Sequence, residues 1–172
     1  ILTHYQTEER PDKEVGRLWH VYDPRGVTNT FSYEDHLRPS GTVLDGPEDV
    51  ITRSRAYDAR GLVTNITEVA PGNTWVLDRS YDGYRQLTSE TTRVNGGLFS
   101  QFSQSWDAAG RRVGLAGGIE SDAHARTFGY RADGLMTQTI GGGQTCHFEY
   151  ADNGPLNLRS NPFRIWEVDG QG

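Results

Sequence analysis

Apolar and polar positions alternate over short stretches of this chain, and apolar residues never form a long run. In the segment 145–150, for example, Cys146 and Phe148 alternate with His147 and Glu149. A two-residue period places successive side chains on opposite faces of a strand. No segment of ten or more residues follows the helical period, so the pattern predicts an all-β chain. Three further runs, rich in Thr and β-branched residues, also predict strands: residues 62–67, 87–92 and 135–140.

A Tyr-Asp-x-x-Gly pattern marks the ends of these strands. Its clearest copy runs from Tyr57 to Gly61, a second copy begins with Trp106, and residues 81–85 form a shuffled copy. Asp accepts a hydrogen bond from the backbone two residues on, and Gly supplies the positive φ that closes a hairpin. Each copy therefore predicts a turn between two strands. We assign this structural motif to Tyr22, Asp23, Gly26, Tyr33, Tyr57, Asp58, Gly61, Tyr81, Asp82, Trp106, Asp107, Gly110, Tyr130, Gly134, Tyr150 and Gly154.

The rings of the motif recur at a nearly constant spacing. They stand at positions 33, 57, 81, 106, 130 and 150, with intervals of 24, 24, 25, 24 and 20 residues. Tyr22 lies outside this series and is expected to mark a short connection in a preceding unit. A repeat of this kind predicts one structural unit per period: strand, turn, strand, loop. Repeated antiparallel hairpins of about 24 residues would then form a curved, solenoid-like sheet, stabilised mainly between neighbouring units.

Three segments follow from this organisation. Residues 1–16 are charged and interrupted by Pro11, and are expected to be an N-terminal loop or lead-in segment. Residues 17–168 form the repeat domain, with a longer loop expected at 40–49 and one more strand at 161–168. Residues 169–172 are expected to be a flexible end.

The repeats resemble the YD repeats of the RHS (rearrangement hotspot) family over roughly residues 17–160. The resemblance rests on the segments 57–64, 23–33 and 106–113. It implies a β-sheet strip that spirals into a shell, secreted or on the surface of bacteria, which encloses a toxic polypeptide. The Tyr and Asp of the motif are then structural. The only Asp-Pro here is Asp23-Pro24 within a repeat, so we expect internal shell repeats without the family's C-terminal core, its self-cleavage site or the toxin.

Composition excludes several classes of protein. The net charge is −6, which disfavours nucleic acid as a partner. The longest apolar run is three residues, far below the ~18 of a membrane span. The single cysteine, Cys146, excludes an intramolecular disulfide. Of 17 basic residues only Lys13 is a lysine, which suggests arginines paired with carboxylates or stacked on rings, with Arg55 and Arg79 as candidates, or simply a GC-rich genome.

No pattern for catalysis, metal or cofactor binding stands out. The five histidines are scattered without the spacing of a metal site. Each turn offers fewer carboxylates than calcium prefers, so the Asp residues are expected to cap their own turns. Cys146 alternates with Phe148 and is expected to be a buried small residue rather than a nucleophile. We therefore expect no enzyme and no cofactor.

Three functions remain open from the sequence. The first is a structural module of an RHS shell that encapsulates or presents a polypeptide. The second is an extracellular carbohydrate- or protein-binding adhesion module that uses the rings as a ladder. The third is a self-assembling filament subunit, since open sheet edges favour self-association. The partners expected for the first are the rest of a longer RHS polypeptide or the enclosed polypeptide.

Overall fold

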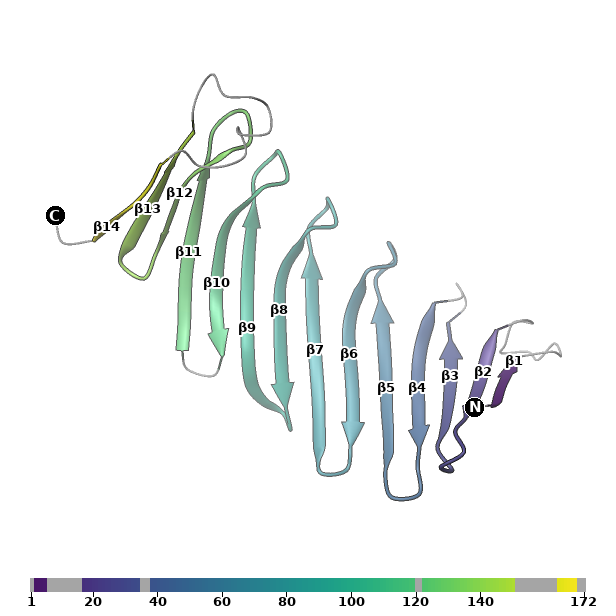
Figure 1. Ribbon diagram of the computed structural model, residues 1–172. Helices are drawn as coiled ribbons and strands as arrows, with labels where there is room; N and C mark the ends of the chain where they lie inside the picture. The colour runs from purple at the N-terminus through teal and green to yellow at the C-terminus, as the bar shows by residue number, and fades with distance from the viewer. Residues whose placement is uncertain (1, 6–16, 35–37, 120–121, 151–163, 170–172) are drawn as a thin grey trace. The chain divides into compact units, whose positions relative to one another are not determined.

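The protein is all β in the parts that the structure describes. The computed structural model describes residues 2–5, 17–34, 38–119, 122–150 and 164–169 (Figure 1). Antiparallel strands connected by short turns make up these ranges, and the helix content there is nil, as the sequence predicted. The chain divides into two compact units, residues 1–80 with 91–99 and residues 81–90 with 100–172. We describe each unit by itself.

Unit 1 is an antiparallel sheet whose strands follow one another in chain order. Strand β8 (Leu87–Val94) is divided between the units, its second half belonging to unit 1. The other strands of unit 1 are β1 (Leu2–Tyr5), β2 (Leu18–Tyr22), β3 (Thr28–Tyr33), β4 (Pro39–Asp45), β5 (Val50–Tyr57), β6 (Val63–Ala70) and most of β7 (Asn73–Tyr81).

Unit 2 repeats this arrangement. Its strands are also antiparallel to their chain neighbours. They are β9 (Gly97–Trp106) from Ser100 on, β10 (Arg112–Ile119), β11 (Asp122–Tyr130), β12 (Met136–Gly141), β13 (Gln144–Glu149) and β14 (Arg164–Asp169). Strands β5 to β8, β10 and β11 are eight or nine residues long.

The two faces of unit 1 carry different side chains. In the row of directly paired residues Thr30, Val43, Thr52, Val69 and Thr74, every member is β-branched. The adjacent row, which points to the opposite face, contains Phe31, Thr42, Arg53, Glu68 and Trp75. Side chains that branch at Cβ pack well on a pleated surface, and paired rows of this kind stabilise a sheet.

The described parts of the sheets have no hydrophobic core. No apolar side chain there is buried, and Ser100 is the one buried polar residue among them. Cross-strand pairs and turns must therefore supply the stability that a globular domain obtains from its interior. Cys146, expected to be buried, is half-buried with a free thiol.

Three segments differ from expectation or extend it. Strand β4 occupies most of residues 40–49, where a long loop was predicted. That prediction was wrong because Gly41, taken as a loop residue, lies inside the strand, opposite Ser32 and Ser54. Strand β1 forms within the expected lead-in segment, while residues 6–16 lie outside the described residues. Strand β14 confirms the last expected strand; residues 170–172 also lie outside the described residues.

Candidate functional site

The turns of the repeat share one hydrogen-bond pattern. In the turn that joins β5 to β6, the Asp58 N–H donates to the Leu62 carbonyl and the Gly61 N–H donates to the Asp58 carbonyl, each over 2.9 Å. The Asp58 carboxylate accepts from the N–H groups of Arg60 and Leu62, also over 2.9 Å. Gly61 has a φ of 83°. Residues that carry a Cβ are strained in this conformation, whereas glycine is not. The same backbone bonds close the turns that contain Asp23, Asp82, Asp107 and Arg131.

The shuffled copy keeps this turn with a different residue at its strained position. Arg85 stands where Gly61 stands in the neighbouring turn, and its φ is 68°. The Arg85 N–H lies 3.3 Å from the Asp82 carbonyl, compared with 2.9 to 3.0 Å for the glycines of the other turns. The glycine of this copy, Gly83, has been displaced to a position that does not need a positive φ.

Several motif rings donate a hydrogen bond to a backbone carbonyl of an earlier hairpin. The Tyr57 hydroxyl at the end of β5 donates to the Pro39 carbonyl at the start of β4, over 2.7 Å. The Trp106 indole N–H donates to the Leu87 carbonyl over 2.9 Å. We name these contacts the ring seam; its other members are Tyr33 to Leu18, at 3.0 Å, and Tyr130 to Arg112, at 2.9 Å.

Arginines cover three of these rings. The guanidinium of Arg38 lies 4.7 Å from the centre of the Tyr57 ring. Arg17 lies 4.7 Å from the Tyr33 ring, and Arg111 lies 4.9 Å from the Tyr130 ring. Each arginine directly precedes the residue whose carbonyl accepts the hydrogen bond from the ring. The ring seam therefore combines a hydrogen bond and a cation–π contact at one point.

The arginine over Tyr57 is thus not Arg55, which the sequence suggested. Residues two apart on one strand are about 7 Å apart, whereas directly paired residues on neighbouring strands are about 5 Å apart. Arg38 directly precedes β4, the neighbour of β5, and from there its guanidinium reaches the ring.

Arg111 shows why arginine suits this position better than lysine. Its Nε donates to the Asp107 carboxylate over 2.7 Å, and another nitrogen donates to the Arg131 carbonyl of the next turn over 2.8 Å. The same planar group covers Tyr130. Only a guanidinium offers several donors and a flat face together. The preference for arginine over lysine thus has a structural basis at this position.

The turn carboxylates are held in their charged form. Hydrogen bonds from the Arg25 side chain and backbone lower the pKa of Asp23 from 3.8 to about 2. Backbone donation from Leu62, followed by the bonds from Arg60, lowers the pKa of Asp58. Backbone and side-chain donation from Arg111 lowers the pKa of Asp107. All three carboxylates are half-buried at the turns, so solvent still reaches and partly screens their ion pairs.

The remaining motif residues lie in different places. The Tyr22 turn joins β2 to β3, at the end of the strands opposite to the Tyr57 turn (Figure 1), which explains its place outside the ring series. Tyr81 ends β7, and Gly110 and Gly134 have the positive φ of the turn. Tyr150 follows β13, and Gly154 lies outside the described residues.

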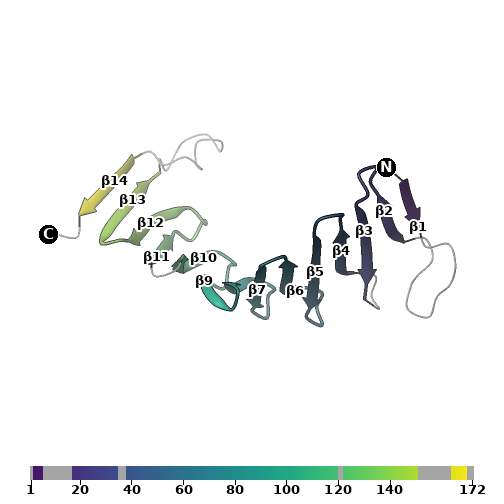
Figure 2. The same ribbon diagram turned by 90° about the horizontal axis from the view of Figure 1, so that it is seen from below.

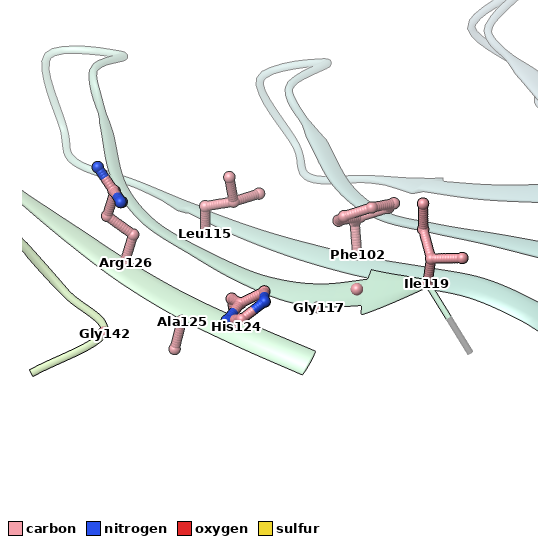
Figure 3. Close-up of a pocket in the computed structure, with 9 residues that line it drawn as sticks. Phe102, Leu115, Gly117, Ile119, His124, Ala125, Arg126 and Gly142 are labelled. Carbon is pink, nitrogen blue, oxygen red and sulfur yellow. The ribbon is translucent and has the colours of Figure 1, made fainter. Parts of the chain in front are cut away.

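Unit 2 contains a hollow on one face of the sheet, with a volume of about 380 Å³. Gly117 on β10 is directly paired with Phe102 on β9 and with His124 on β11. Two residues along each strand, Leu115 is paired with Arg126. Figure 3 shows the side chains of Leu115, Ile119 and Arg126 on the same side of the ribbon. Gly117 has no side chain and forms the floor; a Cβ there would meet the Gln101 carbonyl oxygen at 1.9 Å.

Other chemistry is not assembled in the described part of the chain. Within it, no three His, Cys, Asp or Glu residues come together in a way that could hold a metal ion. The same residues include no helix with the length and apolar character to cross a membrane.

Comparison with known proteins establishes the fold of the chain. A scan of protein families and a search of curated proteins found no match. Among solved structures, the chain is similar to the crystal structure of TcdB2-TccC3 without hypervariable C-terminal region, with a TM-score of 0.50 and 14% sequence identity. The match covers 88% of this chain and 10% of that chain, so this chain spans about a tenth of its length. At this level of identity the likeness shows the fold alone.

The arginines of the ring seam escaped the sequence analysis. Arg38 and Arg111 stand four residues after the turn acids Glu34 and Asp107, with which they form ion pairs. Each also precedes its ring by 19 residues. An acid-to-arginine spacing of four across the turn was therefore the signal that could have identified them.

Proposed function

We propose that this chain is a non-enzymatic structural module: a YD-repeat sheet of the RHS type that forms part of a shell around a toxin or another polypeptide. The observation that carries the proposal is the ring seam, which links hairpins in the same way in both units. A contact that recurs with the sequence repeat allows a wall to be extended by adding units. The fold likeness to TcdB2-TccC3 supports the same proposal.

The residues of the motif act structurally under this proposal. Their carboxylates bind turn amides and arginines, and their ring donors bind backbone carbonyls. These contacts also weigh against the rings as an open ladder for sugars, because arginines already cover one face of Tyr33, Tyr57 and Tyr130. The partners proposed are the rest of a longer RHS polypeptide or its enclosed cargo, in a secreted or surface setting.

A wall around a polypeptide should hold unfolded chains and ignore folded ones. Sedimentation velocity of the full chain with reduced, carboxymethylated α-lactalbumin measures this property, with native α-lactalbumin as the matched control. We expect co-sedimentation with the unfolded form alone. Equal binding of both forms, or of neither, would contradict the proposal.

A second proposal, self-association, rests on the edge strands. Within the described residues β1 pairs only with β2, and β14 pairs only with β13. Unpaired strand edges are templates for pairing with another chain. Light scattering over a hundredfold range of concentration should show a rising mean mass, and a constant monomer mass would count against it.

A further inference from the structure

The hollow in unit 2 joins an apolar floor to an exposed positive charge. Phe102, Leu115 and Ile119 supply the apolar lining, and Ile119 is 54% exposed. An isoleucine that remains so exposed on an ordered strand offers area to a partner. The hollow is large enough to accept one bulky side chain but not a folded domain.

Arg126 gives the hollow its charge preference. It is exposed, and no ion pair to another described residue engages it. Its direct partner across the strands is the apolar Leu115. Among the described residues that line the hollow none is acidic, although the chain as a whole has a net charge of −6. A local positive site in an acidic protein is complementary to a carboxylate.

The spacing of the two features matches an extended peptide. Gly117 lies opposite His124, and Leu115 lies opposite Arg126, two residues further along each strand. Residues i and i+2 of an extended chain point to the same side and are about 7 Å apart. A peptide that runs along β10 and β11 therefore places residue i over Gly117 and residue i+2 beside Arg126.

We propose that this hollow binds an extended polypeptide segment through a bulky apolar residue followed two positions later by Asp or Glu. This inference rests on the proposed function, and it names the kind of cargo segment that the wall would hold. The apolar side chain fills the space over Gly117 between Phe102, Leu115 and Ile119. The carboxylate accepts hydrogen bonds from the Arg126 guanidinium, which can bind both of its oxygens.

The test is an NMR titration of the ¹⁵N-labelled full chain with three nine-residue peptides in a Gly/Ser background. The first carries Phe and, two positions later, Glu; the second has Lys in place of Glu; the third has Ser in place of Phe. We expect the first peptide to shift the amides of Gly117, Ile119 and Arg126 with a Kd of about 1 mM, because it buries one side chain and forms one charged contact. The other two should bind about tenfold more weakly or not at all.

Variants with matched controls locate the site. Arg126→Gln removes the charge and should weaken the Phe–Glu peptide about tenfold, while Arg131→Gln, at an exposed turn position, should not. Ile119→Thr should weaken binding, while Ile140→Thr, 41% exposed on the opposite face, should not. Gly117 is left unchanged because any side chain there would collide with β9.

Three outcomes overturn the inference: equal affinity for the Glu and Lys peptides, shifts confined to other strands, or no binding of any of the peptides. If the unfolded α-lactalbumin binds but these peptides do not, the hollow is excluded while the proposed function stands. If the unfolded α-lactalbumin does not bind, the proposed function itself fails.

Discussion

Single residues at the turns determine how each hairpin closes. Gly61 has no Cβ, so it takes a positive φ without strain, and the space beside it is occupied by the Arg38 side chain, 2.9 Å from where a Cβ would stand. Arg85 holds the equivalent backbone conformation with a full side chain. The shuffled turn therefore carries backbone strain that the glycine turns avoid.

Replacing Arg85 by Gly should stabilise the protein. Glycine relieves the strain of the left-handed conformation, but it also gives the unfolded chain more conformational freedom, which opposes the gain. The net effect should be to raise the free energy of unfolding by about 0.5–1 kcal/mol. The reverse change, Gly61→Arg, is the matched control and should lower it by at least about 1 kcal/mol. Urea denaturation followed by circular dichroism measures both. A destabilised Arg85→Gly variant would show that the side chain of Arg85 contributes more than its strain removes.

The turn carboxylates make stability depend on acid pH. The pKa of Asp23 is about 2 in the folded chain, and those of Asp58 and Asp107 are also below their ordinary value of 3.8. A group whose pKa is lowered by folding stabilises the fold above its ordinary pKa, and this contribution is lost as the pH falls through the folded pKa. The urea midpoint should therefore be constant from pH 7 to about 5 and fall between about pH 4 and pH 2.

Asp107→Asn separates the charge from the turn geometry. The amide oxygen of Asn still accepts from the turn N–H groups, but it does not titrate. The variant should show a shallower fall of the urea midpoint below pH 4 than the unmodified chain. An unchanged slope would mean that Asp107 does not contribute to the acid sensitivity.

At the level of the elements, the ring seam supplies stabilising contacts that a globular domain obtains from a buried core. Paired strands without a buried interior depend on contacts that cross from one hairpin to the next. Each ring of the seam supplies one such contact at the end of an odd-numbered strand. Loss of a seam contact should destabilise the hairpins that the contact joins more than the turn that follows the ring.

Tyr57→Phe tests the seam with the smallest change. It removes the hydroxyl that donates to the Pro39 carbonyl and keeps the ring under Arg38. The free energy of unfolding should fall by about 1 kcal/mol, the usual contribution of one hydrogen bond. Tyr84→Phe is the control, because the Tyr84 side chain is 86% exposed at a turn, and its stability should stay within about 0.5 kcal/mol of the unmodified chain. Equal effects of the two changes would contradict a specific role of the ring contact.

The sequence predicted the elements well where the period of two and the turn residues agreed. The turn at Asp58 and the Thr-rich strands β6, β8 and β12 follow directly from local chemistry. The loop predicted at 40–49 was wrong, because Gly41 breaks the pattern locally while its pairing with Ser32 is set by a neighbouring strand. Likewise, the arginine over Tyr57 directly precedes a different strand, β4. The periodicity of a single strand carries no information on which side chains meet across strands.

At the scale of the whole molecule, the described residues form thin sheets with one large-residue face in unit 1 and a hollow in unit 2. The hollow could not be predicted from the sequence, since it depends on the pairing of Gly117 with Phe102 and His124. Such sheets offer much surface for holding another chain. We therefore propose that the protein acts as a wall and that its partner is an unfolded polypeptide.

A tethered cargo tests most directly whether this sheet holds an unfolded polypeptide. An unfolded, protease-sensitive segment is fused through a flexible Gly/Ser linker to the full chain, and its rate of cleavage is compared with that of the same segment fused to an unrelated, stable β-sheet domain. A short linker gives an effective concentration in the millimolar range, so even weak binding keeps the segment bound for much of the time. We expect cleavage to be slowed about threefold or more, and the protection to disappear when urea unfolds the chain. Cleavage at the same rate in both fusions would contradict the claim that this sheet holds a polypeptide.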